Sequence, residues 1–113
     1  TRFHKFERIY MNRCHFLGKL IDDPFLTSSY STDLVNFTLE VEEYRRDKEG
    51  NKKRRTDLLN FEAWDSAAKT IHKYAGKYDF LVVEAIARNP NHQNSEHVVF
   101  RVTNFKIFPQ ESK

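Results

Sequence analysis

A strongly basic segment, residues 45–55, lies near the middle of this chain of 113 residues. Its seven basic residues, opposed only by Asp47 and Glu49, are Arg45, Arg46, Lys48, Lys52, Lys53, Arg54 and Arg55. The segment therefore carries +5, and because the whole chain carries +3, the remaining residues carry −2. A concentrated positive patch on a nearly neutral body predicts a docking surface for an anionic partner. The alternative is a solvated hairpin whose charges only maintain solubility.

Two aromatic residues, Tyr44 and Trp64, flank this basic segment. Upstream, apolar residues alternate with polar ones as in a strand, and Tyr44 has the polar parity, so it is expected to point outward. The apolar set there is Val35, Phe37, Leu39 and Val41. In residues 56–64 the more apolar set is Leu59, Phe61 and Ala63. The set expected to be exposed is Leu58, Asn60, Glu62 and Trp64.

Cations beside exposed aromatic rings suit single-stranded nucleic acid, because a single strand offers base faces together with a charged backbone. Arg and Lys neutralise phosphates and release counterions. Each exposed ring stacks on a base for about 1–3 kcal/mol without requiring a particular sequence. Tyr44 and Trp64 are therefore the expected stacking residues. The alternative is that Trp64 packs under a following helix and that Tyr44 covers the edge of the fold.

Short strands and tight turns must position these residues. Period-two alternation predicts strands over residues 13–21, 35–44, 56–64, 79–87 and 97–108. Residues 27–33 are polar and predict a turn-rich loop, and residues 47–51 predict a hairpin tip in which Gly50 adopts positive φ. Asp65 or Ser66 is expected to cap a short helix that runs to Ala75 and ends at Gly76. Three strands, a helix and two strands predict an all-β, five-stranded OB-fold barrel with one helix between strands 3 and 4.

The sequence offers little for catalysis or metal binding. Cys14 and His15 are neighbours in a strand and face opposite sides, and His92 and His97 have no nearby cysteine. No nucleophile motif or phosphate-binding glycine loop is present. We expect no enzyme activity, metal or cofactor, and a small β-barrel hydrolase is the least supported alternative. No run approaches the ~18 apolar residues of a membrane span, and a lone cysteine fits a reducing compartment.

Several short motifs resemble single-stranded DNA-binding proteins (SSBs) of the bacterial and mitochondrial type. Residues 11–24 resemble the opening strand of that family, and Asn36-Phe37-Thr38-Leu39 is similar to its second strand. Arg45-Arg46-Asp47-Lys48 is similar to its basic hairpin, Tyr74 with Gly76 to its helix end, and Val82-Val83-Glu84 to its fourth strand. The resemblance implies an OB-fold protein, usually a homotetramer, that coats single-stranded DNA during replication, recombination and repair.

The resemblance also assigns contact residues. Tyr44 and Trp64 fall where the family has stacking aromatics. Leu58, Leu59 and Asn60 replace a tryptophan, a histidine and an arginine of the family, and the loop over 88–96 lacks its tryptophan. The implied nucleic-acid-binding set is Tyr44, Arg45, Arg46, Lys48, Lys52, Lys53, Arg54, Arg55, Leu58, Asn60, Trp64 and Arg88. Weaker stacking is expected, and the leucines favour an alternative function, an SSB-like module that binds RNA or a protein partner in a larger organellar complex.

The resemblance also predicts how the chain is organised and where it acts. Residues 11–108 are expected to form the OB-fold domain, with an N-terminal extension over 1–10 and a short tail over 109–113. The tail lacks the acidic, glycine-rich end of bacterial SSBs, and Phe6-Glu7-Arg8 resembles mitochondrial members. A mitochondrial location is therefore expected, with a bacterial or phage-infected cytoplasm as the alternative.

Overall fold

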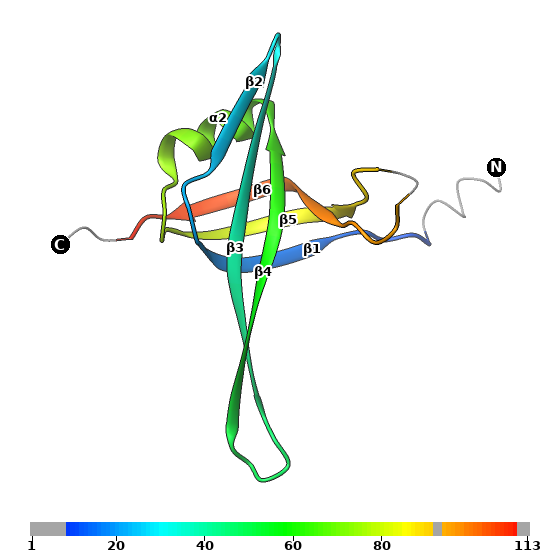
Figure 1. Ribbon diagram of the computed structural model, residues 1–113, viewed down its shortest axis with the longest axis vertical. Coiled ribbons are helices and arrows are strands. Elements are labelled where there is room, and N and C mark those ends of the chain that lie inside the picture. Colours follow the sequence, from blue (N-terminus) through cyan, green and yellow to red (C-terminus); the bar gives the residue numbers. More distant parts are fainter. Residues whose placement is uncertain (1–8, 92–93, 111–113) are drawn as a thin grey trace.

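The computed structural model describes residues 9–91 and 94–110, which form six strands and one helix (Figure 1). In chain order these are β1 (Cys14–Leu20), β2 (Phe25–Ser29), β3 (Thr32–Arg46), β4 (Lys52–Trp64), α2 (Asp65–Tyr74), β5 (Phe80–Arg88) and β6 (Val99–Phe108). The strand order is β1-β5-β6-β4-β3-β2, and a further pairing of β1 with β3 closes five strands into a barrel. Within these residues no helix is long and apolar enough to cross a membrane.

Closure of the barrel depends on Gly18 in β1. This strand pairs with β5 along its length but with β3 only at its end, through Lys19↔Glu40 and Leu20↔Leu39. A Cβ atom on Gly18 would lie 2.8 Å from the backbone oxygen of Glu40, closer than real contacts allow. The missing side chain therefore lets β3 cross β1 at this point.

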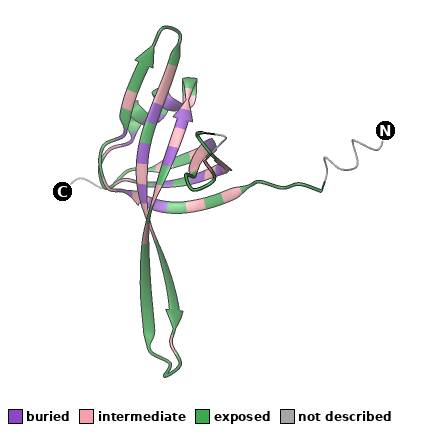
Figure 2. Ribbon diagram, turned by 45° about the vertical axis from the view of Figure 1, so that its right-hand side comes forward, coloured by how far each residue is buried: buried purple, intermediate pink, exposed green. Residues whose placement is uncertain are grey.

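The apolar parity of each strand fills the barrel. Phe61 is fully buried, stacks on Phe37 with 5.3 Å between ring centroids, and meets Phe16 edge-on at 5.4 Å. The helix α2 packs on the barrel through Ala68 and Ile71, which are also fully buried. Figure 2 shows the buried residues gathered in the barrel and under the helix. The apolar sets predicted for β3 and β4 are buried or half-buried, as expected.

The β3–β4 hairpin extends far beyond this core. We call residues 42–56 the arm; its strand pairs run from Glu42↔Thr56 to Arg46↔Lys52. No residue of the arm is buried, and all except the half-buried Asp47 are exposed. Figures 1 and 2 show the arm as a twisted, two-stranded ribbon that points away from the body of the molecule.

Asp47 organises the tip of the arm. Its Oδ1 atom accepts hydrogen bonds from the backbone N–H groups of Glu49 (3.0 Å) and Asn51 (2.8 Å). Gly50 has a φ of +83°, so the hairpin tip predicted over 47–51 is confirmed.

The predicted all-β, five-stranded barrel is confirmed, with β1 and β3–β6 as its strands and α2 between the third and fourth of them. The loop predicted over 27–33 is wrong, because only Tyr30 and Ser31 form a turn there. The other residues belong to β2 and β3, which pair in a hairpin. Four of the five side chains of β2 are exposed, so this strand has no apolar alternation that a sequence pattern could reveal.

The predicted ends of the helix are also wrong in detail. No side chain caps the first turn, because Trp64 occupies the capping position and Asp65 has a φ of +56°. At the other end Ala75 is already extended, so the helix stops at Tyr74 before Gly76 is reached.

Candidate nucleic-acid interface

Among the predicted contact residues of β3 and β4, one outward parity is shared by Tyr44, Leu58, Asn60 and Trp64. The cross-strand pairs that show this are Leu34↔Trp64, Thr38↔Asn60, Glu40↔Leu58 and Tyr44↔Arg54. However, Trp64 lies ten residues beyond Arg54 along β4, which at ~3.3 Å per residue places it about 33 Å from Tyr44. The two aromatic residues therefore belong to two separate parts of one face.

Tyr44 lies on the arm, outside the barrel, so it does not cover the barrel edge. It is 54% exposed, and the Nζ atom of Lys52 lies 4.5 Å from the centroid of its ring. Cation–π attraction at this distance holds the ring and the ammonium group together. A nucleotide on the arm would meet a π face and a positive charge at one place.

The basic residues of the arm divide between its two faces, a division that was not predicted from the sequence. Arg46, Lys52 and Arg54 share the parity of Tyr44, whereas Arg45, Lys53 and Arg55 have the opposite parity. Lys48 lies in the tip. A hollow of about 570 Å³ is lined by Arg45, Arg46, Asp47, Lys48, Lys53, Arg54 and Arg55. The arm therefore offers positive charge on both sides.

Three of these cations are already paired with acids. The pairs are Lys53–Asp47 (4.0 Å), Arg54–Glu42 (3.4 Å) and Arg55–Asp57 (3.3 Å). Arg46 donates a hydrogen bond to the carbonyl of Gly50 at 2.8 Å. Among the residues that the structure describes, Arg45 and Lys48 have no partner at all. Exposed ion pairs are worth only about 0–1 kcal/mol, so phosphate can displace the acids.

The middle of the face carries Leu58 and Asn60. Leu58 is 57% exposed and offers an apolar surface without a ring. Asn60 accepts a hydrogen bond from the Thr38 hydroxyl at 2.9 Å, which uses part of its hydrogen-bonding capacity within the sheet. This stretch between Tyr44 and Trp64 is therefore suited to weak, apolar contact rather than to stacking.

Trp64 lies at the far end of the face, and it is half-buried rather than fully exposed. Its Nε1 donates a hydrogen bond to Oε2 of Glu62 at 2.9 Å, and the guanidinium carbon of Arg101 lies 5.4 Å from the ring centroid. A hollow of about 250 Å³ beside it is lined by Glu62, Trp64, Arg88, Asn89, Pro90, Val99 and Arg101. The structure thus brings Trp64 together with the predicted Arg88, but not with the arm.

Arg101 belongs to this site but was not predicted from the sequence. Its position follows from a parallel pairing of β4 with β6, in which Glu62 and Arg101 are partners. Pairing between strands that are 39 residues apart leaves no local pattern in the sequence. Only the order of the strands in the barrel, which sets β6 beside β4, could have indicated that Arg101 lies next to Glu62.

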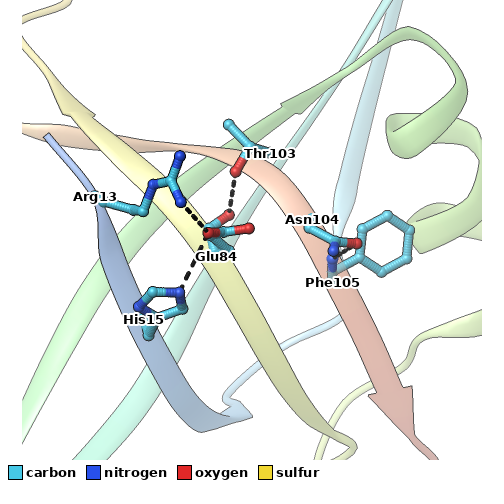
Figure 3. A network of polar contacts seen from close by, with 6 residues as sticks. All are labelled: Arg13, His15, Glu84, Thr103, Asn104 and Phe105. Atoms are coloured by element: carbon cyan, nitrogen blue, oxygen red, sulfur yellow. Dashed lines mark hydrogen bonds and ion pairs between the residues drawn. The ribbon is translucent and has the colours of Figure 1, made fainter.

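The outer face of β1, β5 and β6 is a second candidate surface. Its exposed apolar residues are Leu17, Phe80, Val82 and Phe108, which are 39–61% exposed. Figure 3 shows the polar cluster beside them, in which Glu84 accepts from His15 at 3.3 Å and pairs with Arg13 at 3.8 Å. The Thr103 hydroxyl donates to the backbone oxygen of Glu84 at 3.1 Å. This mixed surface is suited to protein contact.

No group of three or more metal-ligating side chains occurs in the described ranges. Cys14 is half-buried and His15 is exposed, consistent with their opposite directions from β1. His92 lies outside the described residues.

Comparison with solved structures shows proteins of the same architecture. Two solved structures of the single-stranded DNA binding protein from Thermus aquaticus, a deletion mutant and the wild type, are similar with TM-scores of 0.77 and 0.74. Both are 13% identical and the matches cover 88% of this chain, but only 51% and 50% of the Thermus chains. The chain therefore spans about half the length of those proteins, and the likeness confirms the predicted OB-type fold.

No curated protein sequence matches the chain. By contrast, the model of the Single-strand binding protein family matches residues 11–108. The chain therefore belongs to the single-strand binding protein family.

Proposed function

We propose that the chain coats and protects single-stranded DNA, largely independently of sequence, during DNA replication, recombination and repair. The observation that carries this proposal is the arm, which presents Tyr44 under Lys52 together with cations on both faces. Stacking on a ring and contact with phosphate both tolerate any base sequence. An exposed ribbon of this kind can follow a flexible strand without reading base edges.

Titration with oligothymidine at several salt concentrations tests the proposal. Because Trp64 is the only tryptophan of the chain, its fluorescence reports one end of the face, while tyrosine emission includes the arm. We expect quenching and an affinity that falls steeply with salt. Replacing Arg54 and Arg55 by Glu should weaken binding to oligomers of every sequence alike. Micromolar protein that shows neither quenching nor salt dependence would contradict the proposal.

A second function, binding of RNA or of a protein partner in an organellar complex, is favoured by Leu58. The exposed leucine offers apolar surface where a stacking ring would serve single strands better. Competition between RNA and DNA oligomers of equal sequence separates the two functions. Preferential binding of RNA, or recovery of a stoichiometric partner from the native source, would support this alternative.

We also propose that the chain acts as a homo-oligomer, with a tetramer favoured, through the outer face of β1, β5 and β6. The support is its exposed apolar set, Leu17, Phe80, Val82 and Phe108. Light scattering with and without long oligothymidine measures the assembly, and Val82→Glu should lower the mass. The mitochondrial location stays a prediction, because Phe6-Glu7-Arg8 lies outside the described residues.

A further inference from the structure

A single carboxylate oxygen holds the Trp64 site together. Oε2 of Glu62 accepts one hydrogen bond from Nε1 of Trp64 at 2.9 Å and another from Nε of Arg101 at 3.0 Å. Arg101 also lies over the indole ring, with 5.4 Å between its guanidinium carbon and the centroid. The same oxygen therefore fixes a stacking surface and a cation relative to each other.

This ion pair is more enclosed than those of the arm. The side chains of Glu62 and Arg101 are 15% and 36% exposed, whereas those of Glu42 and Arg54 are 32% and 62% exposed. Solvent screens the enclosed pair less, and its two hydrogen bonds to one atom restrict both donors. The geometry around Trp64 is consequently held more firmly than the geometry of any cation on the arm.

The hollow beside this cluster is small. Its volume of about 250 Å³ lies below the low end, about 300 Å³, of the sites that enclose a whole small molecule. It is lined by Trp64 and by two cations, Arg88 and Arg101. These dimensions fit one base of a polymer with its neighbouring phosphate.

We propose that Glu62 is the positioning residue of a one-base subsite, an inference that rests on the single-strand binding proposed above. Glu62 orients the indole of Trp64 so that a base entering the hollow stacks on it. The same carboxylate holds Arg101 for contact with the flanking phosphate, and Arg88 lies in the lining of the same hollow. Glu62 acts through these residues and makes no contact with phosphate itself.

Removal of the Glu62 carboxylate should change the affinity for single-stranded DNA in the direction opposite to that expected from charge alone. Removing an acid from a surface that binds a polyanion should strengthen binding, because repulsion of phosphate is relieved. If Glu62 positions Trp64 and Arg101, its removal weakens binding instead. Glu42 is the matched control, because it lies on the same face of the same strand pair and also pairs with an arginine.

The experiment compares Glu62→Gln with Glu42→Gln in oligothymidine titrations followed by Trp64 fluorescence. We expect Glu62→Gln to weaken binding about 5-fold, part of the stacking energy of one base, and to reduce the quenching at saturation. Glu42→Gln should bind equally or more tightly, with unchanged quenching. In the free protein, Glu62→Gln should also move Trp64 emission to longer wavelength, because an uncharged amide holds the indole N–H and Arg101 less firmly than the carboxylate does and the ring meets more water. Equal behaviour of the two variants would overturn the proposal.

A double-mutant cycle guards against a purely structural effect of Glu62→Gln. Trp64→Phe keeps a stacking ring but lacks the N–H group that Glu62 holds, so in this background Glu62→Gln should cost distinctly less affinity than in the native chain. Anisotropy of a labelled oligomer measures all four affinities. An equal loss in both backgrounds would overturn the proposal. If the native chain binds no oligothymidine, the function proposed above fails; if it binds and only these differences are missing, the positioning role alone fails.

Discussion

The ammonium group of Lys52 lies over the ring of Tyr44, with 4.5 Å between Nζ and the ring centroid. Neither residue is buried, so the pair contributes little to the stability of the barrel. It lies on the arm, about 33 Å from the Trp64 site along β4. A single strand that follows the whole face would therefore meet an aromatic ring with a nearby cation at each end.

Tyr44→Ala should weaken binding of single-stranded DNA about 5- to 100-fold, because stacking on one ring contributes about 1–3 kcal/mol. Tyr44→Phe should retain most of the affinity, since it keeps the ring. Tyr74→Ala is the control, because Tyr74 on α2 is 61% exposed and has Lys73 at 5.2 Å from its ring. Fluorescence titration measures each affinity, and an equal loss for both alanine variants would contradict a role specific to the arm.

Arg45→Ala should reduce the salt dependence of binding more than Arg55→Ala. Both side chains lie on the same face of the arm, but Arg55 is paired with Asp57 at 3.3 Å, whereas Arg45 has no partner among the described residues. A cation without an acidic partner neutralises one phosphate completely. Arg45→Ala should therefore reduce the magnitude of the slope of log K against log salt by about 0.7. Titrations between low and high salt give the slopes, and a larger change for Arg55→Ala would refute the argument.

Gly18→Ala should destabilise the barrel by about 1–3 kcal/mol, because the added methyl group would press against β3. The nearest atom to a Cβ would be the Glu40 oxygen at 2.8 Å, with Val41 at 2.9 Å. Gly76→Ala is the matched control, since its Cβ would be no closer than 3.5 Å to any atom, and should change stability by less than about 0.5 kcal/mol. Urea unfolding measures both, and equal stability of the two variants would show that β3 moves freely at Gly18.

The β2–β3 hairpin should lose a stabilising contact in acid. The Ser28 hydroxyl, which donates to Asp33 at 2.7 Å, lowers the pKa of the Asp33 carboxyl, and Lys69 at 3.4 Å adds to this against opposing desolvation. Because folding lowers this pKa, the contacts of Asp33 contribute fully to the stability of the fold above the ordinary pKa of about 3.9. Their contribution is lost as the pH falls below that value.

Asp33→Asn should therefore be less stable than the native chain at pH 6, and the difference should shrink as the pH falls below about 4. Thermal unfolding at several pH values measures this difference. Asp22→Asn, at a carboxylate without a described partner, is the control. A gap between native and Asp33→Asn protein that stays constant with pH would contradict the linkage.

Sequence patterns predicted the barrel because its strands are buried on one side only. Val35, Phe37 and Leu39 alternate with polar residues, and period two then fixes the direction of Tyr44 and Trp64. β2 was not predicted, because almost all of its side chains are exposed and its sequence therefore shows no such alternation.

The candidate site was predictable in its residue types but not in its arrangement. Alternation could have separated Arg45 from Arg46, because neighbouring strand residues face opposite sides. Nothing local could have joined Trp64 to Arg101, because their proximity depends on the parallel pairing of β4 with β6. Nor could local sequence show that the barrel ends short of Tyr44, since that depends on where β3 crosses β1.

The absence of buried side chains on the arm frees residues 42–56 from the packing constraints that fix the barrel. Matched insertions of two residues in each strand would lengthen the ribbon and keep the parity of its faces. A single extra residue in one strand would instead turn Tyr44 toward the side of Arg45. The distance that the arm extends from the barrel can therefore change, provided that each side chain stays on its own face of the ribbon.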